Sequence, residues 1–141
     1  MKATLYGSAL SLYTGRARSY LIKAGIDYLE DIPNTPHFAN NVLPKAGGRQ
    51  SMPTLELPDG TVIRDGAAII DHFEAVSQNG FSPTSPKQRI VSLLFDVIGA
   101  EGLLRPAMHY RWNFAEENLK FLEFHFESMM PDRPDRKEKG V

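Results

Sequence analysis

The first quarter of the chain alternates between strand and helix patterns. Residues 3–6 form a short alternating segment typical of a strand, and apolar residues recur at helical spacing from about Thr14 onward. Gly25 is expected to close this helix, because glycine readily takes the left-handed conformation of a C-terminal cap. Residues 26–32 then form a second strand, with Tyr28 and Leu29 in its apolar middle. The pattern predicts a β-α-β unit.

A second unit follows an irregular connection, residues 33–48, which is rich in proline and asparagine and has room for at most one helical turn. Residues 54–57 and 61–64 have the pattern of a hairpin, because the Pro-Asp-Gly between them is a turn sequence. Asp65 can cap the next helix, whose apolar residues are expected to face the sheet. These residues are Ala68, Ile69, Ile70 and Phe73. The order predicted for this unit is β-β-α.

The second half of the chain carries only helical patterns. Residues 77–87 are rich in serine and proline and lack periodicity, which is typical of an interdomain linker. The apolar periodicity of a helix follows, and Pro106 is expected to kink or end that helix, because a proline inside a helix costs ~3 kcal/mol. Asn113 and Glu116 resemble a capping box that opens a second helix.

This second helix is apolar on two faces. One stripe contains Leu119, Leu122, Phe126 and Met129, and a second contains Phe121 and Phe124. A buried aromatic ring covers about 150–250 Å², so the phenylalanines would leave a few hundred Å² exposed without a partner. After Met130 the chain is charged and contains two prolines, so it can bury little. We expect a truncated form of a longer chain, with dimerisation covering part of this surface.

Composition excludes several classes of function. The 141 residues include 16 basic and 17 acidic side chains, and the net charge of -1 gives no general reason to bind nucleic acid or an anionic membrane. There is no signal-peptide core and no apolar stretch near the roughly 20 residues of a membrane span, so we expect a soluble, cytoplasmic protein. The chain lacks cysteine and has only 4 scattered histidines, so neither a thiol nucleophile nor a metal site is expected.

One proline stands out in these patterns. Pro53 directly precedes the strand at residues 54–57, although proline has no amide proton to give to a sheet. Either Pro53 simply starts the strand, or its fixed φ and missing N–H serve something outside the sheet.

The segment SMPTLELPDGTVIRDGAAIIDHFE, residues 51–74, resembles the proline, strand, hairpin, acid and small-residue helix signature of the cytosolic glutathione transferase family. The similarity covers essentially the whole chain. It implies an α/β protein with a thioredoxin-like, glutathione-binding domain and a mixed sheet at residues 1–76. A linker at 77–87 and a partial all-helical domain at 88–141 would follow. It also implies a homodimer, in which the first domain of one subunit meets the helices of the other.

Two alignments compete for the thiol-activating residue in YGSALSLYTGRARSYLIKAGIDY, residues 6–28. In the first, which we prefer, Ser11 occupies the place of the activating residue of serine-type members. In the second, Tyr13 begins a stretch similar to the Y-F-N-G-R-G-R of tyrosine-type members, although Leu12 then stands where the catalytic tyrosine belongs. Arg18 matches the second arginine of that stretch. It would add positive charge near the thiol, or else lie on a solvated helix face.

The resemblance also implies how glutathione is held. The Met52–Pro53 bond would be cis, with the backbone N–H and C=O of Met52 pairing with the cysteinyl part of glutathione. Asp65 would pair with the γ-glutamyl ammonium group, and helix N–H groups would hold its carboxylate. Gly66 stands in the place of the family's usual serine, so one hydrogen bond worth about 1.5–3 kcal/mol is missing.

The electrophile is expected between the two domains. A polar and aromatic cluster follows Pro106, and we expect Tyr110 or Trp112 of this cluster to line the pocket. The cluster contains Arg105, His109, Tyr110, Arg111 and Trp112. We favour an enzyme that activates the thiol of glutathione, its co-substrate, for attack on small electrophiles. The alternative is a non-catalytic domain of the same fold, used for binding, assembly or regulation.

Overall fold

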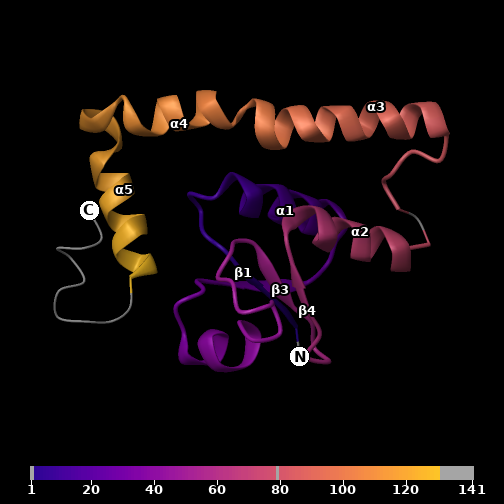
Figure 1. Cartoon of the computed structure of the whole chain (residues 1–141), viewed down its shortest axis with the longest axis horizontal. Helices are drawn as coiled ribbons and strands as arrows, with labels where there is room; N and C mark the ends of the chain where they lie inside the picture. Colours follow the sequence, from indigo (N-terminus) through magenta and orange to yellow (C-terminus); the bar gives the residue numbers. More distant parts are fainter. Residues whose placement is uncertain (1, 79, 131–141) are drawn as a thin grey trace.

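The computed structural model describes residues 2–78 and 80–130, and a four-stranded mixed sheet organises the N-terminal half (Figure 1). The strands are β1 (Ala3–Tyr6), β2 (Tyr28–Asp31), β3 (Thr54–Glu56) and β4 (Val62–Arg64). Their order in the sheet is β2-β1-β3-β4. β1 is parallel to β2 and antiparallel to β3, and β3 is antiparallel to β4. The predicted β-α-β and β-β-α units, and with them the thioredoxin-like fold, are confirmed.

Helices cover one face of the sheet, and a π-helical turn covers the other. The helices are α1 (Leu12–Lys23) and α2 (Gly66–Val76), and the turn is η1 (Phe38–Val42). Leu21 of α1 and Ile69 of α2 pack into one buried cluster with Leu5 of β1. Successive strand residues face opposite sides, so Tyr6 points to the other face, where its ring centroid lies 4.9 Å from that of Phe38.

Two details of this half differ from the sequence prediction. β2 spans only 4 residues, and Leu29 is exposed because it points to the opposite face of the sheet from Tyr28, which packs against the buried cluster. Ala68 is exposed rather than packed on the sheet. The face of α2 that meets the sheet contains Ile69 and Phe73, which are four residues apart, and Ala68 lies about 100° away from Ile69 around the helix.

Glu74 of α2 fastens the start of the connection between the two halves. Its carboxylate accepts hydrogen bonds from the hydroxyl of Tyr20 at 2.6 Å and from the main-chain N–H groups of Phe81 and Ser82 at 2.8 and 2.7 Å. Burial opposes ionisation of Glu74, but these hydrogen bonds outweigh it and lower its pKa to about 2. The described part of the connection, from Ser77 to α3, contains no helix or strand.

The C-terminal half is helical, and Figure 1 shows α3 and α4 end to end above α1 and α2, with α5 turning back toward the sheet. The elements are α3 (Pro86–Val97), the π-helical turn η2 (Ile98–Gly102), α4 (Leu104–Trp112) and α5 (Ala115–Met129). The break falls at Leu103, with φ −90° and ψ 0°, and not at Pro106. Pro106 instead lies in the first turn of α4, where a missing N–H removes no helical hydrogen bond.

The predicted capping box at the start of α5 is wrong. Phe114 is the N-cap and makes no side-chain cap, while the Asn113 side chain lies 2.6 Å from Nδ1 of His109. Asn118 joins the two helices instead, because its side-chain amide donates to the carbonyl of Tyr110 at 2.7 Å. A side chain within α5, and not a cap before it, therefore joins α5 to α4.

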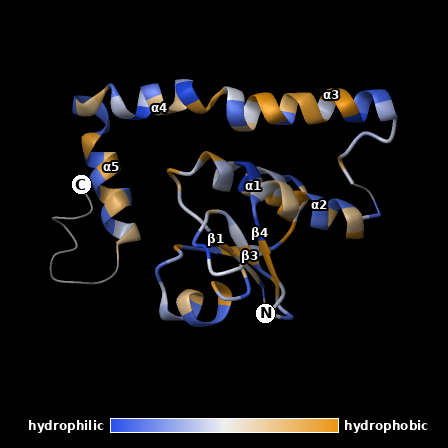
Figure 2. Ribbon diagram, viewed as in Figure 1, coloured by the Kyte–Doolittle hydropathy of each residue, from blue (hydrophilic) through white to orange (hydrophobic). Residues whose placement is uncertain are grey.

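Large apolar side chains are exposed on these helices, and Figure 2 shows hydrophobic residues along much of α3. None of residues 86–112, all of which the structure describes, is buried. On α5 the first predicted stripe is only partly covered, since Leu122 is buried and Leu119 is exposed, and Phe121 and Phe124 are exposed as well. The charged tail, residues 131–141, lies outside the described residues. Within the described ranges, no helix is both long and apolar enough to cross a lipid bilayer.

Candidate functional site

A cavity of about 240 Å³ lies where the two halves of the chain meet. Residues that precede and begin α1, including Ser11, line one side together with Met52. α4 and α5 line the other side, with Met108 and Phe126 among their contributions. The cavity therefore combines polar groups at a helix start with an apolar wall from distant parts of the sequence.

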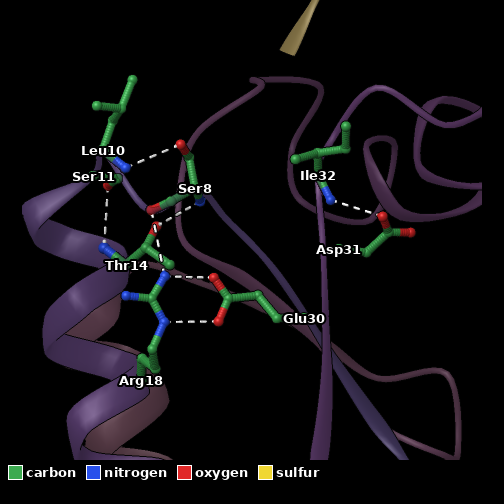
Figure 3. A network of polar contacts seen from close by, with 8 residues as sticks. All are labelled: Ser8, Leu10, Ser11, Thr14, Arg18, Glu30, Asp31 and Ile32. Atoms are coloured by element: carbon green, nitrogen blue, oxygen red, sulfur yellow. Dashed lines mark hydrogen bonds and ion pairs between the residues drawn. The ribbon is translucent and has the colours of Figure 1, made fainter. Parts of the chain in front are cut away.

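Ser11 begins α1 and keeps a free donor. Its backbone is extended, with φ −84° and ψ 116°, and its Oγ accepts a hydrogen bond from the N–H of Thr14 at 3.1 Å (Figure 3). A serine hydroxyl has one donor and two acceptor positions, so this cap leaves the O–H proton unused. Among the described residues that proton has no acceptor. Ser11 can thus cap α1 and donate to an anion in the cavity at the same time.

Arg18 lies outside the cavity lining and is paired. Its Nε donates to Glu30 at 2.7 Å, its Nη2 donates to the other oxygen of the same carboxylate, and Nη2 also lies 3.4 Å from the carbonyl oxygen of Ser8 (Figure 3). The hydrogen bond to Glu30 raises the pKa of Arg18. The bidentate pair joins α1 to β2, and the contact with the Ser8 carbonyl extends it to the loop before Ser11, so in this structure Arg18 positions the loop.

Tyr13 lines the same cavity, but its hydroxyl already has a partner. It donates to Oε1 of Glu101 in η2 at 3.3 Å. Burial, followed by the charge of the Glu101 carboxylate, raises the pKa of Tyr13. A phenol that is engaged in this way and has a raised pKa is a poorer donor to a thiolate than the Ser11 hydroxyl.

The Met52–Pro53 peptide bond is cis. Pro53 is fully buried, and its carbonyl accepts from the N–H of Asp65 at 3.0 Å. Met52 precedes β3 and lines the cavity, and within the described residues its own N–H and C=O make no hydrogen bond. Both main-chain groups of Met52 are therefore open to a strand-like partner.

Asp65 and Gly66 form the start of α2. Asp65 has φ 87°, a conformation that costs a non-glycine residue about 1–3 kcal/mol, and its Oδ1 accepts from the N–H of Ala67 at 2.7 Å. Gly66 is buried, and a Cβ added there would lie 3.2 Å from the carbonyl oxygen of Tyr13. The two helix starts thus approach each other closely, with Pro53 beside them.

The cavity contains one chemically important residue that the sequence analysis did not single out. Arg111 lines it, whereas Tyr110 and Trp112 do not. Tyr110 stacks on Phe114 with ring centroids 5.8 Å apart, and Trp112 packs against Phe126 at the same centroid distance. The spacing of Leu104, Met108 and Arg111 is i, i+4, i+7, so this pattern would have found the inward face of α4.

The end of α5 closes one side of the site. The side-chain amide of Asn34 donates to the carbonyls of Ser128 at 3.0 Å and of Met130 at 3.3 Å. Phe126 and Met129, in the same stretch, line the cavity. A hydroxyl and a helix start on one side and apolar side chains on the other suit a small anion that is joined to, or beside, an apolar molecule.

Comparison with known families matches the N-terminal half of the chain to a family model. The model described as glutathione S-transferase, N-terminal domain, matches residues 5–79, which are 75 of the 141 residues. The match contains Ser11, Met52, Pro53 and Asp65. A comparison with curated proteins gives no significant match.

Solved structures similar to this chain include several glutathione transferases. Glutathione transferase Omega 3C from Trametes versicolor is 15% identical with a TM-score of 0.62, and the alignment covers 99% of this chain and 70% of the Trametes protein. An epsilon-class enzyme from the housefly, Musca domestica, is 20% identical with a TM-score of 0.59, covering 99% and 75%. A theta-class protein from Xanthomonas axonopodis pv. citri, with glutathione bound, is 18% identical with a TM-score of 0.59, covering 89% and 65%. At these identities the likeness establishes the fold.

Proposed function

Since the chain belongs to the glutathione S-transferase family, we propose that it binds glutathione with the thiol directed into this cavity and activates that thiol for attack on small electrophiles. The observation that carries this proposal is the Ser11 hydroxyl, which caps α1, lines the cavity and retains an unused proton. Family membership and a cavity of about 240 Å³ beside that hydroxyl support it further.

The chemistry required of the chain is stabilisation of a thiolate. A free thiol has a pKa near 8.5, so only a few per cent is ionised at neutral pH. The Ser11 hydroxyl donates to the thiolate, and the positive end of α1 adds a favourable field. The thiol proton leaves to solvent, the sulfur electron pair forms a bond to the electrophilic carbon, and a leaving group such as chloride departs with its bonding pair.

The remaining contacts hold the peptide part of glutathione. The open N–H and C=O of Met52 pair with its cysteinyl main chain, as a further strand would. The Asp65 carboxylate pairs with the γ-glutamyl ammonium group, and the N–H groups at the start of α2 hold the γ-glutamyl carboxylate. Arg18 acts through the loop that it ties to Glu30, so it is a positioning residue.

Replacing Ser11 tests this proposal. Ser11→Ala should lower kcat with 1-chloro-2,4-dinitrobenzene at least about tenfold and leave glutathione affinity nearly unchanged, because the hydroxyl acts on the thiolate. Alanine also removes the cap, at about 1 kcal/mol, so Ser11→Gly serves as a second variant that retains most of the capping stability. Ser19→Ala, an exposed serine on the same helix, is the matched control.

Full activity in both Ser11 variants would overturn the role of the hydroxyl. A wild-type protein that neither binds immobilised glutathione nor accelerates the reaction would overturn the proposed function as a whole.

We infer also that the chain forms a homodimer through its apolar helices. Large apolar side chains of α3 are at least half exposed, including Leu94, Phe95 and Val97. Soluble monomers rarely expose contiguous apolar patches larger than a few hundred Å². A second copy of the chain would remove this surface from water.

A further inference from the structure

The cavity lining contains one cationic side chain among the described residues, Arg111 of α4. On the basis of the function proposed above, we propose that Arg111 makes this cavity selective for electrophiles that carry a carboxylate on an apolar body. Arg111 would then determine which electrophiles are conjugated to glutathione.

The position of Arg111 is determined by its helix and by the loop before α1. Leu104, Met108 and Arg111 lie on one face of α4 and all three line the cavity. Nη2 of Arg111 donates to the carbonyl oxygen of Leu10, and Nη1 lies 3.9 Å from Sδ of Met108. The guanidinium is therefore held across the cavity from α4 to the residue next to Ser11.

The charge of Arg111 has no carboxylate partner among the described residues. This distinguishes it from Arg16, Arg18 and Arg89, which pair with Asp96, Glu30 and Asp71. The two groups that Arg111 does contact, a carbonyl and a thioether, are neutral. A guanidinium offers five N–H donors in a planar fork that matches a carboxylate, so it retains both charge and donors for a ligand.

The walls around Arg111 define the rest of the ligand. Leu104, Met108, Phe126 and Met129 are apolar, and an ion pair in such surroundings is stronger than one in water. A cavity of about 150 Å³ is known to hold a benzene ring, so 240 Å³ suits one substituted ring. The ligand with the best match is a single aromatic or aliphatic body of that size with one carboxylate.

Two electrophiles that share one ring and one leaving group, and of which only one carries a negative charge, test the proposal. In 4-chloro-3,5-dinitrobenzoate and its methyl ester, the thiolate of glutathione bonds to the same ring carbon and chloride leaves with the bonding pair. Each enzymatic rate is divided by the rate with free glutathione, which removes differences in intrinsic reactivity. The wild-type protein should have the higher corrected kcat/KM with the acid, and an equal or lower value would overturn the proposal without any variant.

Variants then assign the preference to Arg111. Arg111→Gln should lower kcat/KM for the acid about ten- to a hundredfold and leave the ester within about threefold, because one charge-assisted interaction is lost. Arg111→Lys should retain part of the preference, since the charge remains and the fork is lost. Arg105→Gln, an exposed arginine on the same helix, should change neither substrate. Equal losses for acid and ester in Arg111→Gln would overturn the proposal.

A binding measurement separates this inference from the proposed function. Calorimetric titration with 3,5-dinitrobenzoate and its methyl ester, which lack the leaving group, needs neither glutathione nor turnover. If the wild-type protein binds the acid and Arg111→Gln binds it more weakly, the role of Arg111 is supported even when the transfer reaction is absent. Transfer activity with no difference between acid and ester in rate or binding leaves the proposed function standing and overturns the inference.

Discussion

Gly66 begins α2 at its close approach to α1, so replacing it with serine tests the anion site at the start of α2. A Cβ at this position would lie 3.2 Å from the carbonyl oxygen of Tyr13 and 3.6 Å from Cγ of Pro53. The first contact is tighter than most, so the Tyr13 carbonyl has to move by a few tenths of an ångström. Gly66 has no positive φ, so its backbone accepts a side chain without strain.

Alanine and serine at this position separate the steric effect from the hydroxyl. In Gly66→Ala the displacement of the Tyr13 carbonyl lowers the stability of the folded chain. The lower conformational entropy of the unfolded chain offsets this loss by about 0.4–1 kcal/mol. We expect the free energy of unfolding to change by less than about 1 kcal/mol, and glutathione affinity to stay equal or fall. Gly66→Ser adds one hydrogen bond to the γ-glutamyl carboxylate, worth about 1.5–3 kcal/mol. The Kd of Gly66→Ser for glutathione should therefore be about ten- to a hundredfold lower than that of Gly66→Ala.

The assay is calorimetric titration of glutathione into wild-type protein and both variants. Both substitutions displace the Tyr13 carbonyl equally, so their difference reports the hydroxyl alone. Asp65→Asn is a companion variant, because its side-chain oxygen can still accept from the N–H of Ala67 while the charge is gone. It should weaken glutathione binding about tenfold and leave thermal stability nearly unchanged. Equal dissociation constants for Gly66→Ala and Gly66→Ser would refute the placement of the carboxylate at this helix start.

Two further predictions concern stability and assembly. The pKa of Glu74 is lowered from 4.5 to about 2 in the folded chain, so its contribution to stability is fully present above about pH 4.5 and is lost as pH falls toward 2. Thermal unfolding of Glu74→Gln should show a lower Tm at pH 7 and a smaller loss of Tm across that range, and parallel curves for the two proteins would contradict this. Sedimentation at micromolar concentration should give a dimer, and Phe95→Glu on exposed α3 should shift it toward monomer; a wild-type monomer at that concentration would contradict the dimer.

The element order of the N-terminal half could be predicted because each element carries a local signal. Gly25 has the positive φ expected after α1, and the Pro-Asp-Gly turn joins β3 to β4. Ser11 and Met52 were singled out by the resemblance to the glutathione transferase family and not by such local signals, and the structure places both in the lining of the cavity.

The inward face of α4 could not be predicted from the proline alone. The helical path breaks at Leu103 and not at Pro106, and each residue turns a helix by about 100°, so a wrong break gives a wrong face. Arg111, and not Tyr110 or Trp112, lines the cavity, because it continues the i, i+4, i+7 face that begins with Leu104 and Met108. The pairing of Arg18 with Glu30 joins a helix to an edge strand, and no local pattern encodes such a contact. Nor does composition indicate the positive φ of Asp65.

The hydrogen bonds from Asn34 make the stability of α5 depend on a residue from the other half of the chain. The last four carbonyls of a helix lack intrahelical partners, and Asn34 donates to that of Ser128 and also to the carbonyl of Met130, the residue after α5. Fraying of this turn therefore breaks a contact between the two halves and, in the same event, releases Phe126 and Met129 from the cavity wall. The rate of amide hydrogen exchange at the end of α5 therefore reports how often the cavity opens. A ligand that fills the cavity should slow this exchange.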